Sequence, residues 1–122
     1  MSRLLELIAA ERPDAVRVSP GGEILIEVDI AADLVDRAES LGIAILGMEG
    51  FLVDDDSNRV YPSLARLSNY SRPIDSDRHQ FVRRTCADAR ATLQEWSEPP
   101  VAGYHMHREA RGRHMLAIVL DD

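Results

Sequence analysis

The stretch from Gly42 to Leu64 brings together glycines, which can cradle phosphates, and a run of aspartates, which can hold a cation. Gly42 and Gly47 are spaced as at the start of a phosphate-binding P-loop, but Met48 and Glu49 stand where that motif needs lysine and serine or threonine. A glutamate would repel phosphate. A dinucleotide site is not indicated either, because an apolar strand lies between the two glycines where a helix should open. We therefore expect these glycines to be structural.

The acidic run after the glycines resembles half of a calcium loop. Asp54, Asp56 and Asn58 match its ligand positions 1, 3 and 5. Arg59 then replaces the glycine that the sharp turn requires, and Ala65 replaces the bidentate glutamate that closes the loop. The run is better interpreted as the exposed tip of a β-hairpin.

Three histidines, His105, His107 and His114, lie in the C-terminal tail. A hairpin that turns at Arg111-Gly112 would place them on one face with Glu109, and three imidazoles and a carboxylate can bind zinc. The opposite face, which we expect to be the core side, would carry Tyr104, Met106, Ala110, Met115, Ala117 and Val119. A shift of register by one residue would rearrange this set, so a solvent-facing polar strand and a titrating interface stay open as well.

A catalytic nucleophile is not indicated anywhere in the chain. There is no Gly-x-Ser-x-Gly pattern, and the single cysteine, Cys86, falls on an apolar helical stripe, where burial would raise its pKa. We therefore expect a protein that is not an enzyme and that holds no cofactor or metal. A metal-binding protein, or a small metal-dependent enzyme that uses the histidine hairpin, is the alternative.

The elements that would position these residues form one α+β domain over residues 1–122. Helices are predicted over 2–11, from about 30 to 40 with Asp29 as N-cap and Gly42 after its end, and over about 77–97 with Asp77 as N-cap. Strands are predicted at 15–18, 23–28, 43–46, 51–53, 59–61 and in the tail hairpin. This order favours a mainly antiparallel sheet with the helices on one side.

Charge is distributed unevenly along the chain, whose formal net charge is −7. Residues 1–56 hold 13 acidic residues and 4 arginines, whereas residues 57–122 hold 8 acidic residues and 10 arginines. The first half would repel nucleic acid and attract a basic protein surface. No apolar run reaches the length of a membrane span, and a lone cysteine fits a reducing cytoplasm, so we expect a cytoplasmic protein.

The stretch from Leu41 to Trp96 contains "LGIAILGMEGF", an acidic turn, "YPSLARLSNYS" and a helix with the pattern "FV…A…L..W". In these features it resembles small bacterial immunity proteins, which are cytoplasmic antidotes to polymorphic toxins. The resemblance covers about half of the chain and excludes the N-terminal hairpin and the histidine tail. It implies an acidic α+β domain without catalytic residues that occludes its cognate toxin, and it singles out Glu49.

These observations together predict a toxin-binding surface made of acidic residues. Its expected members are Asp33, Asp36, Glu49, Asp54, Asp55 and Asp56, with Tyr61 or Tyr70 as an apolar anchor. The expected partner is a basic toxin domain, with no nucleic acid and no membrane. A small adaptor, or a homodimer formed through the long amphipathic helix, fits the same sequence.

Overall fold

The structure is a computed structural model that describes residues 2–54, 56–57, 59–73, 77–97 and 113–122. It has three α-helices and a five-stranded antiparallel sheet in this part of the chain, which confirms the predicted α+β fold. In chain order the elements are α1 (Arg3–Glu11), a 3₁₀ turn (Pro13–Ala15), β1 (Val16–Val18), β2 (Ile24–Glu27), α2 (Val28–Ser40), β3 (Ile45–Asp54), β4 (Arg59–Asn69), α3 (Arg78–Trp96) and β5 (Arg113–Leu120).

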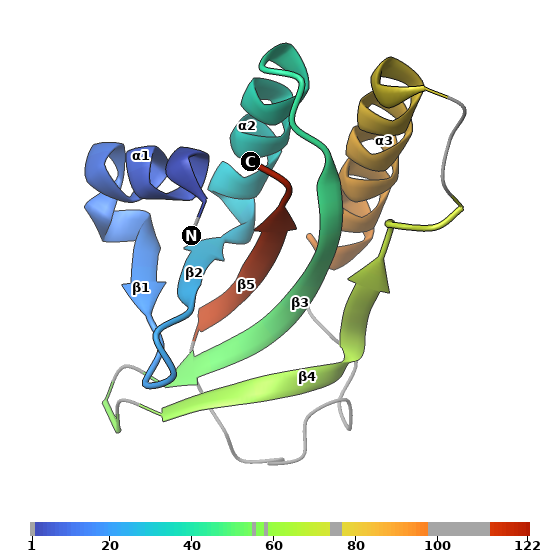
Figure 1. Ribbon diagram of the computed structural model, residues 1–122. Helices are drawn as coiled ribbons and strands as arrows, with labels where there is room; N and C mark the ends of the chain where they lie inside the picture. The colour runs from blue at the N-terminus through green and yellow to red at the C-terminus, as the bar shows by residue number, and fades with distance from the viewer. Residues whose placement is uncertain (1, 55, 58, 74–76, 98–112) are drawn as a thin grey trace.

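The strand order is β1-β2-β5-β3-β4, so the last strand of the chain lies in the middle of the sheet. β5 pairs with β2 on one side through Ile26 and Leu116, and with β3 on the other through Met48 and Ile118. It thereby joins two hairpins that are each local in sequence, β1–β2 and β3–β4. Figure 1 shows β3 and β4 as long curved strands and β5 between β2 and β3.

The main hydrophobic core lies between one face of the sheet and the three helices. α2 contributes an apolar stripe and α3 contributes another, as the helical spacing of these residues predicts. From the sheet, Ile26, Met48, Leu116 and Ile118 point into this core, all at most 5% exposed. The predicted stripe of α3 is confirmed, with buried side chains at Val82, Cys86, Ala89, Leu93 and Trp96.

The face of β5 that points to the helices differs from our expectation. Leu116 and Ile118 lie on the helix side, and the strand alternation places His114 on that side too. Met115 and Ala117 belong instead to a second, smaller cluster with Leu25 and Val53, and Val119 is 54% exposed. The prediction failed because a central strand carries apolar side chains on both faces, so alternation alone does not identify the core side.

The helix caps agree with prediction at two positions out of three. Asp77 accepts a hydrogen bond from the backbone N–H of Gln80 at the start of α3, and Gly42, with φ +72°, follows the end of α2. The predicted cap Asp29 is wrong. Helix α2 begins at Val28 with Glu27 in the N-cap position and no side-chain cap, so Asp29 falls in its first turn.

β3 is one strand of ten residues, although two separate strands were predicted at 43–46 and 51–53. Gly47 and Gly50, which lie between the two predicted strands, are inside β3. A Cβ on Gly50 would lie 2.6 Å from Cβ of Arg66, which is too close for two carbon atoms. The Arg66 side chain is 6% exposed and lies over the Trp96 ring, 5.7 Å from its centroid. Gly50 therefore leaves the space in which the Arg66 side chain lies against the Trp96 ring.

Candidate functional site

The two predicted acids of α2 lie on its outer surface, where Asp33 and Asp36 are exposed. They do not share the same electrostatic environment. The guanidinium of Arg90 on α3 pairs with Asp36 at 2.9 Å and with Glu39 at 2.7 Å. No basic side chain of the described residues forms an ion pair with Asp33. Part of the predicted anionic face is thus neutralised by the chain itself.

The acidic run after β3 forms the tip of the β3–β4 hairpin, as predicted for its described residues. Asp54 pairs with Arg59 in the ladder, and its carboxylate accepts hydrogen bonds from the backbone N–H groups of Asp56 and Ser57. A hydrogen bond with the Ser57 side chain, as the first cause, lowers the pKa of Asp54, and the two backbone hydrogen bonds act in the same direction. Asp56 is exposed, and the predicted site residue Asp55 lies outside the described residues.

The predicted acids therefore do not gather on one surface. Figure 1 shows the β3–β4 tip at the lower left and α2 at the top of the molecule, so Asp33 and Asp36 are well separated from Asp54 and Asp56. Glu49 occupies a third place, in the middle of β3. Each group could contribute to a long-range field, but close contact with a single partner surface would involve only some of them.

Glu49 lies on the face of the sheet that points away from the helices. In the register it is level with Leu67 on β4 and with Ala117 on β5, and it is half-buried between these neighbours. Leu67 is 71% exposed and Val119 is 54% exposed on the same face. Large apolar side chains so exposed beside a carboxylate are typical of a surface that another molecule covers.

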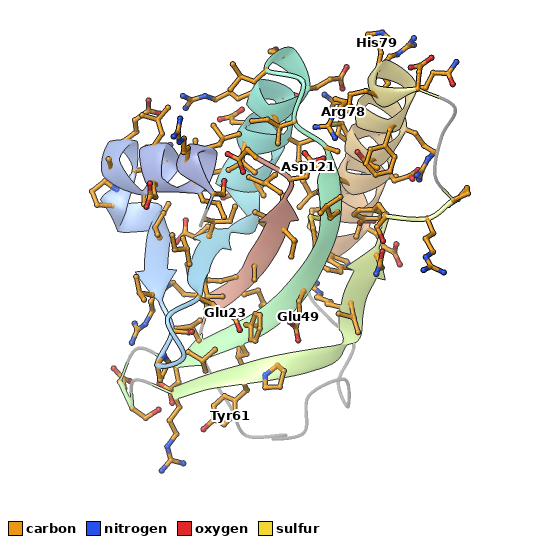
Figure 2. The ribbon with its side chains drawn as sticks, in the orientation of Figure 1. Glu23, Glu49, Tyr61, Arg78, His79 and Asp121 are labelled. Carbon is orange, nitrogen blue, oxygen red and sulfur yellow. The ribbon has the colours of Figure 1, made fainter. Side chains whose placement is uncertain are left out.

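These residues line part of a hollow of about 820 Å³, which extends to Ser2 and Leu5 at the start of α1. We call this hollow the sheet groove and define it by Glu23, Gly47, Glu49, Leu67, Ala117 and Val119. Gly47 pairs with Asn69 and with Val119 in the ladders and adds no side chain to the floor. Figure 2 shows Glu23 and Glu49 on the same side of the sheet.

The described residues that line the sheet groove carry only negative charge. Within the described part of the chain, no arginine or histidine forms an ion pair with Glu23 or Glu49, and no basic residue lines the groove. The other polar residues that line the hollow are neutral: Ser2, Ser68, Asn69 and Ser71. The described residues of the groove can therefore hold a positively charged group.

Sequence reasoning identified only Glu49 among these residues and missed Glu23, Leu67 and Val119. Val119 was assigned to the core, and Leu67 was not assigned to a strand. The sequence did contain an indication of this surface. β3 and β5 carry apolar residues on both faces, whereas the helices were expected to cover only one side of the sheet. Such a sheet must leave one apolar face uncovered or find another cover for it.

The tyrosines proposed as interface anchors have different environments. Tyr70 is 7% exposed, and its hydroxyl donates a hydrogen bond to Oγ1 of Thr92 on α3. Burial raises its pKa. Tyr70 is therefore a core residue, and the prediction that it anchors a partner is wrong for this residue. Tyr61 is partly exposed on β4, level with Leu52 of β3.

The histidine hairpin can be placed only in part. His105 and His107 lie outside the described residues, whereas His114 is the second residue of β5 and points to the helix side. Among the residues that the structure describes, no three histidine, cysteine or acidic side chains come together as a metal site would require. The proposed histidine set stays a prediction, because two of its three members lie outside the described residues.

Cys86 is fully buried and has the properties predicted from its position. Burial, as the first cause, raises the pKa of its thiol to about 11. A thiol with that pKa is almost entirely protonated near neutral pH, so it is a poor nucleophile. Its Sγ lies 3.7 Å from the backbone carbonyl oxygen of Ile43, and it acts as a packing residue.

No protein-family model matches this chain, and neither the curated proteins nor the solved structures contain one similar to it. The resemblance to immunity proteins therefore stays a prediction from the sequence. In the described part of the chain, none of the helices combines the length and the apolar character of a transmembrane span.

Proposed function

We propose that this chain is a non-enzymatic immunity protein that binds a basic bacterial toxin and neutralises it by occlusion. The observation that supports this proposal most is the sheet groove, where exposed Leu67 and Val119 lie beside the carboxylates of Glu23 and Glu49. Apolar area next to unpaired charge of one sign is what a protein of opposite charge would cover. The resemblance in sequence supplies the class of partner.

The overall charge supports the same proposal in a different way. The chain carries a formal net charge of −7, and within the described residues arginines pair with only some of the acids, among them Asp36 and Glu39. Asp33 and Asp56 are exposed and have no ion pair with a described residue. A net negative field speeds the approach of a basic partner without needing close contacts. We therefore assign steering to these acids and docking to the sheet groove.

The proposal is tested with the protein encoded by the neighbouring reading frame. We expect that protein to arrest the growth of a bacterial host, and co-expression of the present chain to restore growth. The purified pair should form a one-to-one complex whose association slows steeply as salt rises, since steering is screened over roughly 8–10 Å at physiological salt. A neighbour that neither arrests growth nor binds, or an association rate independent of salt, would contradict the proposal.

If the toxin is neutralised by occlusion, the stoichiometry of the complex and the covalent structure of the toxin can be predicted. Neutralisation should require one molecule of this chain per toxin and should leave the covalent structure of the toxin unchanged, which intact-mass measurement of the recovered toxin checks. A toxin that is cleaved or modified after mixing would indicate an enzyme instead.

The alternative of a metal-binding protein is tested by metal analysis of protein purified without a histidine tag, where one equivalent of zinc or nickel would favour it.

A further inference from the structure

The sheet groove has a composition that restricts what it can bind. It combines aliphatic side chains at Leu67, Ala117 and Val119 with two carboxylates, Glu23 and Glu49. Its volume of about 820 Å³ is within the range of sites that take a small ligand or a few side chains. We propose that it receives a lysine or arginine side chain of an extended segment of the partner, with aliphatic neighbours of that side chain against Leu67 and Val119.

This inference rests on the proposed function and names the chemistry of its contact. Glu49 is level with Leu67 on one side and with Ala117 on the other, so its carboxylate is flanked by apolar groups. Lysine and arginine pack their methylene stems on apolar surface while the charged end reaches a carboxylate. Neither Glu23 nor Glu49 has an ion pair with the described residues, so a cation in the groove would be the first partner of either carboxylate among them.

Other occupants fit the groove less well. A second copy of this chain placed face to face would bring four carboxylates together, and like charges across an interface oppose association. Phosphate groups of nucleic acid or of anionic lipid would meet the same repulsion. A basic segment alone satisfies both the charge and the exposed apolar side chains.

The probe for this inference is a capped pentapeptide that alternates valine and lysine. We expect it to shift the backbone amide NMR signals of the groove residues in β3 and β5. The double variant Glu23→Gln/Glu49→Gln should bind it about tenfold or more weakly, since close charge pairs at interfaces contribute at least that much. A peptide with glutamate in place of lysine should not bind.

A matched control separates contact from net charge. The double variant Asp33→Asn/Asp56→Asn loses the same two charges at exposed positions outside the groove. It should bind the valine-lysine peptide nearly as the unmodified chain does. Both double variants should unfold at the same urea concentration as the unmodified chain, because none of the four carboxylates has an ion pair with a described residue.

Several outcomes would overturn the inference. The inference is wrong if the lysine peptide does not bind or if the glutamate peptide binds equally well. It is also wrong if both double variants lose the same affinity for the lysine peptide, or if the peptide shifts only the NMR signals of residues outside the groove. Free lysine or guanidinium that binds as tightly as the peptide would assign the groove to a small cation. A concentration-dependent dimer that Leu67→Glu dissociates would assign it to a second copy.

The inference and the proposed function fail separately. If the neighbouring protein is bound and neutralised equally by the Glu23→Gln/Glu49→Gln variant, the groove assignment is wrong and the immunity function stands. If the peptide binds in the groove while the neighbouring protein is neither bound nor neutralised, the groove assignment stands and the immunity function is wrong.

Discussion

The Arg78 guanidinium and the Asp121 carboxylate form a bidentate ion pair that joins the start of α3 to the residue after β5. The same guanidinium donates to the carbonyl of Gly42 at 2.9 Å, and Asp121 also accepts from the backbone N–H of Ala44 at 2.8 Å. Figure 2 shows the pair at the upper end of the sheet, between the ends of α2 and α3. One ion pair therefore connects three segments that are distant in sequence.

We expect Asp121→Asn to lower the free energy of unfolding by about 1 kcal/mol at neutral pH. The contribution is modest because the Arg78 side chain is 54% exposed and the pair is partly screened by solvent. Hydrogen bonds from Arg78, as the first cause, lower the pKa of Asp121 below its ordinary value of 3.8. Urea unfolding at a series of pH values measures the effect.

The pH dependence of this effect has a definite sign. A carboxylate with a lowered folded pKa stabilises the fold above its unfolded pKa, and the contribution disappears as pH falls through the folded pKa. The free energy of unfolding of the unmodified chain should thus exceed that of Asp121→Asn by a constant amount above about pH 5. This excess should vanish toward lower pH. Asp33→Asn removes an exposed carboxylate that has no ion pair with a described residue, and it should change the free energy of unfolding little at neutral pH. A difference for Asp121→Asn that grows on acidification would contradict the assignment.

Gly50→Ala should destabilise the protein by about 2 kcal/mol, as overpacking of a core usually does. The new Cβ would come within 2.6 Å of the Arg66 Cβ and would push that side chain away from the Trp96 ring. Because Trp96 is the only tryptophan, its fluorescence spectrum reports the displacement directly.

The matched control for this change is Gly21→Ala. The nearest atom to a Cβ there is Oγ of Ser19 at 3.8 Å, which is an ordinary contact. We expect neither a stability loss nor a change in Trp96 fluorescence for this variant. If both alanine variants had the same stability and the same fluorescence, the close approach of β3 and Arg66 would not explain why residue 50 is glycine.

Arg90→Gln should weaken the connection between α2 and α3, because it removes the ion pairs with Asp36 and Glu39. The Arg90 side chain is 40% exposed, so the loss should stay below about 1 kcal/mol and should shrink in high salt. Arg83→Gln removes an exposed arginine of the same helix that pairs with none of the described acids. Equal effects of the two changes on urea unfolding would show that net charge, and not the bridge, is responsible.

The thiol of Cys86 should not react with an aromatic disulfide reagent at pH 8 while the protein is folded. Its pKa of about 11 leaves on the order of 0.1% of it as thiolate, and the side chain is fully buried. One equivalent should react once the chain is unfolded in guanidinium chloride. Rapid reaction of the folded protein would show that the helix layer opens easily around this residue.

Much of the local structure could be predicted from the sequence, because it depends on residues close in the chain. The three helices follow from apolar side chains at helical spacing, and the β3–β4 tip follows from a run of aspartates between apolar strands. The N-cap of α3 at Asp77 follows from its own side chain. In each case neighbours within one turn or one hairpin supply the stabilising contacts.

The tertiary structure alone decided which strands are neighbours and which parts of their faces are buried. β5 lies between β2 and β3. Because of that placement, Leu116 on one face of β5 packs in the main core, whereas Ala117 and Val119 on the other face line the sheet groove. Glu23 and Glu49 share one hollow only because strands distant in sequence pair in that order. Alternation along a strand shows which side chains share a face, but pairing between distant segments determines what lies opposite that face.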